Sequence, residues 1–203
     1  MSPRPRKVSD EDVFAATYRA MSSLGPGELT LADIAAEAGV TAGAIVQRFG
    51  SKRALQLALA RTAALYAGEF IDGLRAKHKS PLAALRDYAD CMAQMAASPA
   101  ALARSLAYLQ VDISDPDFRK HLLVQSRATR SSMIALLTEA VTKGELAKGT
   151  DVARLTRLLE TVMGGALLTW GIYREGAALT WMREHVEAIL APHVKKRGAR
   201  RRR

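Results

Sequence analysis

A regular series of helix start and stop signals restricts the fold of this chain more than any other feature. Ser9 precedes an acidic turn, Asp10 to Asp12, and Thr30 is followed three residues later by Asp33, which resembles a capping box. Apolar residues recur at helical spacing between such signals, and no strand-like alternation or internal repeat is evident. We therefore predict an all-α fold of about nine helices.

The expected helices fall into two groups. Three short helices come first, over residues 10–24, 30–39 and 41–49. A fourth begins after Ser51, meets no helix breaker before Gly73, and is expected to end there or as late as about residue 79. Ser or Asp followed by Pro marks three later starts, because proline suits the first helical position. The later helices are expected after Ser80, Ser98 and Asp115, and over residues 151–174 and 177–191.

Chain length and cysteine content indicate a protein with a sizeable core in a reducing compartment. The chain has 203 residues and is 49% hydrophobic, enough for a sizeable core. Cys91 is the single cysteine, so no disulfide can form within the chain, and a reducing, cytoplasmic setting is expected. The apolar stretch 164–173 is far shorter than the roughly 18 residues that a membrane helix needs. We expect no membrane partner.

The net charge of +10 is concentrated at the two ends of the chain. Three basic residues lie within 1–7 and seven within 195–203, and these ends contain no acidic residue. Removing these ten from the 30 Lys and Arg leaves 20, equal to the number of Asp and Glu. Such ends suit sequence-independent attraction to a polyanion such as nucleic acid. Anionic lipid, or a role in solubility alone, is the alternative for the C-terminal run.

The second and third expected helices are separated only by Gly39-Val40-Thr41, which is the spacing of a helix-turn-helix. Gly39 suits this turn because a tight turn between helices needs a residue that tolerates positive φ. The side chains expected to form the core of these helices are Val13, Thr17, Met21, Ile34, Ala35, Ala38, Val40, Ile45, Phe49 and Leu55.

The run Thr30-Leu31, Ile34-Ala35, Ala38-Gly39-Val40-Thr41, Gly43, Ile45, Phe49, Ser51-Lys52 and Leu55 resembles the DNA-binding domain of the TetR family of transcriptional regulators. This resemblance covers about residues 8–55. It implies a homodimer that binds double-stranded operator DNA and is released when a small molecule enters the larger C-terminal domain. Two positions depart from the family pattern, since the family often has Tyr at position 46 and His or Tyr at position 48. This chain has Val46 and Arg48 there.

Four segments are therefore expected. They are a basic arm (1–7), a DNA-binding domain (8–55), a helical ligand-binding and dimerisation domain (56–193) and a basic tail (194–203).

The third helix is expected to enter the major groove, although its outward side chains are short. Alanine and valine can contact a thymine methyl group, Gln47 can pair with adenine, and Arg48 can bind a phosphate or turn toward guanine. We therefore expect few direct base contacts and an affinity that comes mainly from phosphates. The predicted DNA-binding residues are Arg4, Arg6, Lys7, Thr30, Thr41, Ala42, Gly43, Ala44, Val46, Gln47, Arg48 and Lys52.

The helix 151–174 has an apolar stripe too wide for one buried face, and Gly164-Gly165 in its middle favours close helix approach. With the following helix it is expected to form a four-helix dimer interface through Leu155, Leu159, Val162, Gly165, Ala166, Trp170, Met182, Val186 and Ile189.

An apolar ligand pocket with a few polar groups is expected on the middle helices. The candidates are Tyr66, Phe70, Tyr88, Cys91, Met92, Met95, Tyr108, Gln125, Met133 and Met163, each of which plain core packing would also explain. The ligand would be small and largely apolar.

No catalytic, metal or cofactor motif is found. The four histidines are scattered, and Glu184-His185-Val186-Glu187 lacks the second histidine of a zinc-binding helix. The sequence therefore predicts a ligand-responsive transcriptional regulator, most simply a repressor, without enzymatic activity. A helical membrane-surface protein, or a small-molecule-binding protein without DNA specificity, is the alternative.

Overall fold

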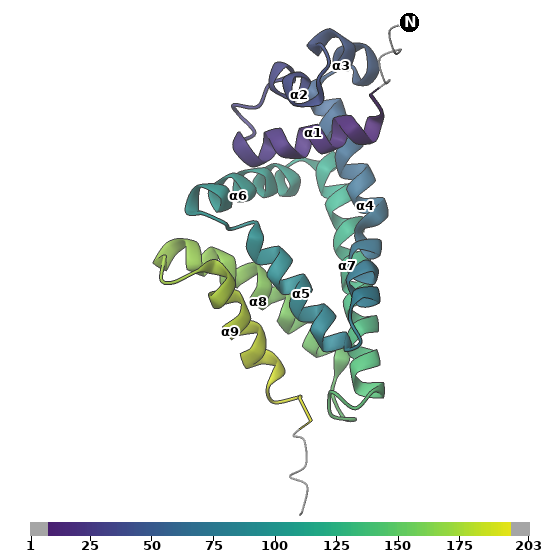
Figure 1. Cartoon of the computed structure of the whole chain (residues 1–203), viewed down its shortest axis with the longest axis vertical. Coiled ribbons are helices and arrows are strands. Elements are labelled where there is room, and N and C mark those ends of the chain that lie inside the picture. The colour runs from purple at the N-terminus through teal and green to yellow at the C-terminus, as the bar shows by residue number, and fades with distance from the viewer. Residues whose placement is uncertain (1–7, 196–203) are drawn as a thin grey trace, which may run out of the picture. The chain divides into compact units, whose positions relative to one another are not determined.

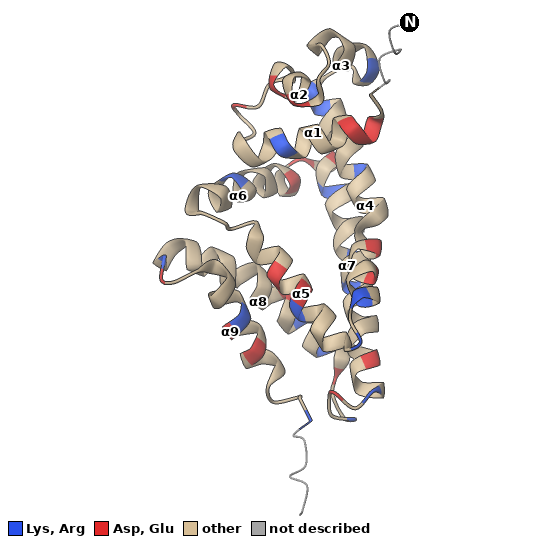
Figure 2. Ribbon diagram, in the orientation of Figure 1, with Lys and Arg blue, Asp and Glu red and all other residues tan. Residues whose placement is uncertain are grey.

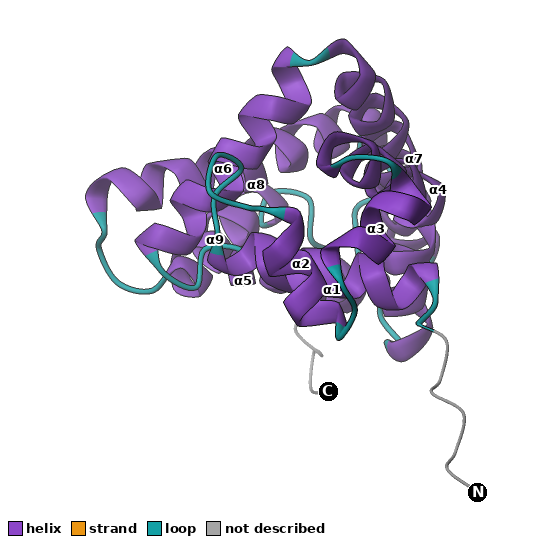
Figure 3. Ribbon diagram, turned by 90° about the horizontal axis from the view of Figure 1, so that it is seen from above, coloured by secondary structure: helices purple, strands orange, loops and turns teal. Residues whose placement is uncertain are grey.

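The computed structural model describes residues 8–195, which form nine α-helices and no extended strand (Figures 1 and 3). This confirms the predicted all-α class. The helices are α1 (Asp10–Ser23), α2 (Leu31–Ala38), α3 (Ala42–Phe49), α4 (Lys52–Lys77), α5 (Pro81–Gln94), α6 (Pro99–Ser114), α7 (Pro116–Thr142), α8 (Val152–Tyr173) and α9 (Ala178–Leu190). None of them combines the length and apolar character needed to span a membrane.

The helices belong to two compact units. Unit 1 contains the described residues up to Leu65 together with Ala103–Val124, and unit 2 contains Tyr66–Leu102 and the described residues from Gln125 onward. The sequence predicted a boundary near residue 55 between a DNA-binding domain and a ligand-binding domain. The two units are defined by packing and not by function, so this boundary stays a prediction.

Reciprocal caps fix the beginnings of the first two helices. The Ser9 hydroxyl accepts from the Asp12 backbone N–H at 3.1 Å, and the Asp12 carboxylate accepts from the Ser9 N–H at 2.9 Å. Thr30 and Asp33 make the same pair of bonds at 3.2 and 2.8 Å. Because each box satisfies two N–H groups that a helix end leaves unpaired, α1 and α2 begin at defined residues.

The turn between α2 and α3 depends on Gly39, whose φ of 67° and ψ of 33° are left-handed. Its backbone N–H and that of Val40 turn back to carbonyls of the last turn of α2, with Val40 N lying 3.0 Å from the Ala35 oxygen. A residue with a Cβ adopts this conformation only with strain, so the glycine sets the angle at which α3 leaves α2.

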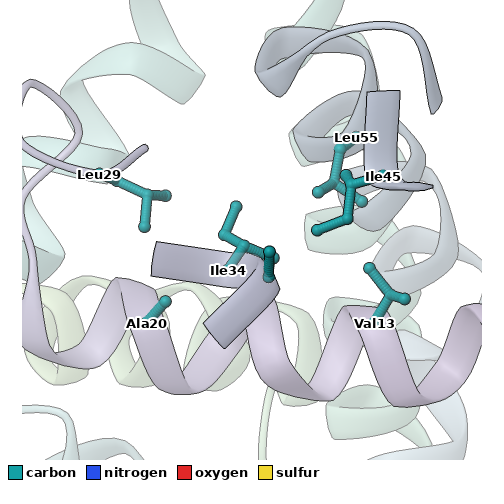
Figure 4. Close-up of a cluster of buried hydrophobic side chains, with 7 residues drawn as sticks. Val13, Ala20, Leu29, Ile34, Ile45 and Leu55 are labelled. Atoms are coloured by element: carbon teal, nitrogen blue, oxygen red, sulfur yellow. The ribbon is translucent and has the colours of Figure 1, made fainter. Parts of the chain in front are cut away.

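The core of the helix-turn-helix is a compact apolar cluster in unit 1 (Figure 4). The side chains of Val13, Ile34, Ile45 and Leu55 are at most 2% exposed, and each comes from a different helix. Phe49 and Val40 pack against the cluster, as expected, whereas Ala38 is only half-buried and Leu29 is an unpredicted member. This cluster holds α3 as a supported rather than an isolated helix.

Unit 2 is built around α5, α8 and α9, which pack on one another. Its fully buried side chains include Leu85 of α5, Leu155 and Leu159 of α8, and Met182 of α9. Two charged pairs connect the helices at their edges, Arg183 to Asp90 at 2.7 and 2.8 Å and Arg86 to Glu187. After α9 the backbone pairs with the loop before α8, through an isolated bridge between Leu146 and Val194.

Candidate nucleic-acid interface

Helix α3 turns one side toward the core of unit 1 and leaves the other side open. Ile45 is 2% exposed, whereas Gly43, Ala44, Gln47 and Arg48 are exposed and Val46 keeps 46% of its surface. In Figure 2 the ribbon of α3 is uncharged except at one end, which is basic. The open side of α3 therefore has short side chains and one long neutral polar group, Gln47.

Ala42 of α3 is partly covered by the core of unit 1. Ala42 is half-buried and packs against the unit 1 cluster together with Phe49. Ala42, Ile45 and Phe49 are separated by three and four residues and so lie on one helical face. Ala42 was predicted to contact DNA, and with part of its surface covered by the core that role stays a prediction.

The two threonines predicted to contact phosphates differ in whether the hydroxyl proton is already used in a hydrogen bond. The Thr41 hydroxyl accepts from the Ala44 N–H at 3.1 Å, so its own proton stays available to a phosphate oxygen. The Thr30 hydroxyl instead donates to the Asp33 carboxylate at 2.6 Å, and this bond helps to lower the pKa of Asp33. Thr41 is the better placed of the two to bind an anion.

Lys52 is tied to the loop between α1 and α2. Its Nζ donates to the carbonyl oxygen of Leu29 at 2.7 Å and to that of Pro26 at 3.2 Å. An ammonium group has three donors, so one remains for a phosphate while the other two stabilise the loop. The predicted residue is thus partly structural.

Arg48, at the end of α3, is bound to the beginning of α1. Its Nη1 donates to the Val8 carbonyl oxygen at 2.8 Å, its Nη2 forms an ion pair with Asp10, and its guanidinium lies 5.6 Å from the centroid of the Phe49 ring. The prediction had Arg48 free to reach a phosphate. Arg4, Arg6 and Lys7, the other predicted basic contacts, lie outside the described residues.

Unit 1 contains a second long-range ion pair, which was not predicted. Arg53, in the first turn of α4, donates through Nη2 to Asp117 at 2.7 Å and to Asp115 at 2.9 Å, at the start of α7. These bonds raise the pKa of Arg53, and the bond from Arg53 lowers that of Asp115. More than 60 residues separate the partners, so no local sequence signal could have indicated the contact.

The predicted pocket residues lie in different environments. Tyr108 belongs to unit 1, where its hydroxyl donates to the Leu24 carbonyl at 2.9 Å, and burial raises its pKa to about 12. Met133 and Met163 are buried in unit 2. Those that keep exposed surface there are Tyr66, Phe70, Tyr88, Cys91, Met92, Met95 and Gln125.

Two of the exposed pocket candidates are brought together. The rings of Phe70 and Tyr88 meet edge to face, with 6.3 Å between centroids. Burial, and then the charge of Glu160, raises the pKa of Tyr88, so its hydroxyl stays protonated and can donate. Burial and two neighbouring aspartates raise the pKa of Cys91, which disfavours a reactive thiolate.

The wide apolar stripe of α8 is divided between the core and the surface. Six predicted interface residues are covered by their own chain, each at most 6% exposed: Leu155, Leu159, Ala166, Trp170, Met182 and Val186. Val162 and Ile189 are half-buried, and Gly165 is exposed. The apolar surface that α8 leaves open is formed instead by Leu158, Leu168 and Ile172, beside the exposed Gly164 and Gly165.

The described residues contain no group of three or more His, Cys, Asp or Glu arranged to hold a metal ion.

Two family descriptions match the chain. Residues 13–59 match "Bacterial regulatory proteins, tetR family", and residues 106–186 match "Tetracyclin repressor-like, C-terminal domain". No curated protein matches the chain significantly by sequence.

Solved structures share its architecture. A TetR transcription regulator from Haloarcula marismortui has a TM-score of 0.71 and 21% identity, over 92% of this chain and 98% of that chain. SmeT, the repressor of the Stenotrophomonas maltophilia multidrug efflux pump SmeDEF, has a TM-score of 0.64 and 21% identity, over 94% and 93%. The fatty acid degradation regulator FadR from Bacillus halodurans has a TM-score of 0.66 and 16% identity, over 95% and 100%. At these identities the likeness shows a common fold alone.

Proposed function

Because the chain belongs to the TetR family of transcriptional regulators, we propose that it is a ligand-responsive repressor without enzymatic activity. It binds a palindromic operator in the cytoplasm as a homodimer, and a small molecule releases it.

The observation that carries this proposal is the open side of α3. The helix is capped, supported by a buried cluster, and presents Ala44, Val46 and Gln47 to the outside. A helix with such short side chains can enter the major groove closely, where alanine and valine contact thymine methyl groups and Gln47 donates to and accepts from adenine. Phosphate contacts from Thr41 and the third donor of Lys52 fix the register but carry no sequence information.

The homodimer is supported by the apolar surface that unit 2 leaves open. Leu168 and Ile172 are 50% and 71% exposed, and the neighbouring glycines of α8 would let a second helix approach closely. Two-fold pairing of identical chains presents two copies of α3, and an operator with two inverted half-sites matches that symmetry.

The ligand is proposed to be small and largely apolar. The Phe70 and Tyr88 ring pair offers apolar surface and one protonated hydroxyl, the combination with which a binding site orients an apolar molecule.

Selection of duplexes from a random DNA library by the purified protein tests the DNA-binding role. We expect an inverted repeat to be enriched, and Gln47→Ala to relax the preference at about one or two base pairs per half-site, each worth roughly 1–3 kcal/mol. Gln94→Ala, at the end of α5, is the control and should leave the preference unchanged. A wild-type protein that enriched no sequence would refute the role, and an unchanged preference in Gln47→Ala would reject Gln47 as a reader.

A second experiment on the same purified protein distinguishes DNA binding from binding to a membrane surface. Flotation with vesicles containing anionic lipid should leave the protein in the dense fraction at a salt concentration where operator binding persists. A protein that floated with the vesicles and selected no duplex would be a lipid-binding protein instead.

A further inference from the structure

Two pairs of side chains in unit 2 combine aromatic rings with a carboxylate. The rings of Phe70 in α4 and Tyr88 in α5 meet edge to face. Arg130 of α7 is paired with Glu160 of α8, since its Nε lies 2.9 and 2.8 Å from the two carboxylate oxygens and its Nη2 lies 2.7 Å from one of them. We call these four residues, each from a different helix of unit 2, the Glu160 site.

The ring pair and the ion pair are neighbours. Helices α5 and α8 pack on each other, and the charge of Glu160, after burial as the larger cause, raises the pKa of Tyr88. Helices α4 and α7 also approach closely, because a Cβ built on Gly68 would lie 3.4 Å from the Ser132 hydroxyl oxygen. Those two positions lie within one turn of the α4 ring and the α7 arginine, so the four helices bring the rings and the charges to the same level of unit 2.

The two charges of the ion pair differ in how far the protein covers them. The Glu160 side chain is 23% exposed, and it lies on the same helical face as the buried Thr156 and Met163. The Arg130 side chain is 52% exposed. An arginine that lies half in water can turn away at small cost, since exposed ion pairs contribute little to stability. A covered carboxylate, in contrast, needs a cation beside it. The exchangeable member of the pair is therefore the cation.

The surroundings of Glu160 favour a positively charged ligand over a negatively charged one. A ligand ammonium that takes the place of the Arg130 guanidinium keeps the charges balanced. An anion bound at Arg130 would bring a second negative charge beside Glu160, which is unfavourable. The faces of aromatic rings attract cations, and Phe70 keeps half of its surface open to a ligand.

We propose that the Glu160 site binds the positively charged group of an amphipathic amine, which replaces Arg130 at Glu160 while its apolar part contacts the rings of Phe70 and Tyr88. This inference rests on the proposed ligand binding by unit 2 and names the chemical class of the ligand. Glu160 then selects the charge of the ligand, and Arg130 competes with it.

Three probes with the same apolar part and different head groups test the charge preference. They are phenylbutylammonium, phenylbutanoate and phenylbutanol, each with the phenyl ring at the far end of the chain. In isothermal titration calorimetry of the full chain at neutral pH, we expect the ammonium to bind about tenfold more tightly than the alcohol, because it adds an ion pair and a cation–π contact. The carboxylate should bind more weakly than either. Equal affinities, tighter binding of the carboxylate, or no binding of the ammonium overturns the proposal.

Glu160→Gln and Arg130→Gln should change the affinity for the ammonium probe in opposite directions. Glu160→Gln removes the selecting charge, so the ammonium should bind about as the alcohol does, while the affinity for the alcohol itself changes little. Arg130→Gln removes the competing cation and should tighten binding of the ammonium. If the ion pair were only structural, each variant would change the affinities for all three probes alike or leave them unchanged, and either result overturns the proposal.

Asp90→Asn is the matched control. Asp90 of α5 is paired with Arg183 of α9 at 2.7 and 2.8 Å, and the exposures of this pair, 23% and 59%, are close to those of Glu160 and Arg130. The variant removes a carboxylate of the same exposure from another ion pair of unit 2. It should keep the preference for the ammonium, and urea denaturation checks that each variant folds. Loss of the preference in Asp90→Asn would assign it to net charge and overturn the role of Glu160.

Adding the ammonium probe to the complex with the selected operator keeps this inference distinct from the proposed function. Probe binding that depends on Glu160 supports the inference even if the complex stays intact, a result that would count against ligand release. Probe binding without dependence on Glu160 overturns the inference, while selection of an operator through α3 would stand.

Discussion

Neither the backbone conformation nor the packing of α3 requires a glycine at position 43. Its φ is not positive, and a Cβ built on it would meet only the Thr41 hydroxyl oxygen, at 3.9 Å. Alanine is more favourable than glycine inside a helix by roughly 1 kcal/mol. The protein therefore has a less stable α3 than its fold allows, and an external surface lying close to the backbone would explain the glycine.

Gly43→Ala should raise the free energy of unfolding while lowering affinity for the selected operator. The stability gain follows from helix propensity, and the affinity loss follows if DNA lies against the backbone of α3. Urea denaturation and fluorescence anisotropy measure the two quantities. Gly73→Ala is the matched control, since Gly73 lies inside α4 and a Cβ there meets nothing within 4 Å. Unchanged affinity in Gly43→Ala would place the operator elsewhere.

At the scale of whole helices, the elements that the sequence predicted well are those fixed by neighbouring residues. Capping at Ser9 and Thr30, the left-handed Gly39 and the proline starts of α5, α6 and α7 all act within a few positions, so the sequence displays them directly. The side of α8 that faces the core depends on α5 and α9, and the sequence does not show which part of a wide stripe they cover.

Side-chain contacts between distant elements could not be predicted either, because the local sequence does not show which helices pack together. Arg48 and Arg53 look like exposed basic residues near the start of the chain. Their partners, Val8, Asp115 and Asp117, become neighbours only when the helices pack. The prediction of Arg48 as a phosphate contact used its charge and its position on the helix, without its contacts to Val8 and Asp10, and it stays a prediction.

Helices α4 and α7 are connected in unit 2 by a charge cluster centred on Glu139. The Arg75 Nε donates to one Glu139 oxygen at 2.5 Å, and the Lys143 Nζ lies 3.0 Å from the other. These cations, Arg75 first, lower the pKa of Glu139 to about 2. A carboxyl group with a lowered folded-state pKa stabilises the fold above its unfolded pKa, and this contribution disappears as the pH falls through the folded value.

Glu139→Gln should therefore lower stability at pH 7 and make the free energy of unfolding depend less on pH between about 4.5 and about 2. Urea denaturation over this range measures the dependence. Glu184→Gln, on the exposed side of α9, is the control for loss of one carboxylate. If both variants followed the same pH profile as wild type, the cluster would contribute nothing to stability.

For the whole molecule, the question is what covers the apolar surface of α8. Leu168→Arg introduces a charge on the open side of that helix, where Leu168 is 50% exposed, so the monomer fold should tolerate it. A charge at the centre of a helix-helix interface should prevent pairing. We expect sedimentation velocity to show a dimer for wild type and a monomer for Leu168→Arg, with a large loss of operator affinity.

Leu123→Arg provides the comparison, since Leu123 is 46% exposed on α7. It should remain dimeric. A Leu168→Arg protein that stayed dimeric would move the interface away from this surface of α8.

The short side chains of α3 also bear on how such a protein acquires a different target. Ala44 and Val46 are exposed, so a longer polar residue can replace either one without disturbing the buried cluster. Each replacement would add a hydrogen-bonding group where none exists, while the helix and its support stay the same. If α3 reads the operator as proposed, single substitutions at these two positions should change the preferred sequence, and selection of duplexes by such variants would measure the change.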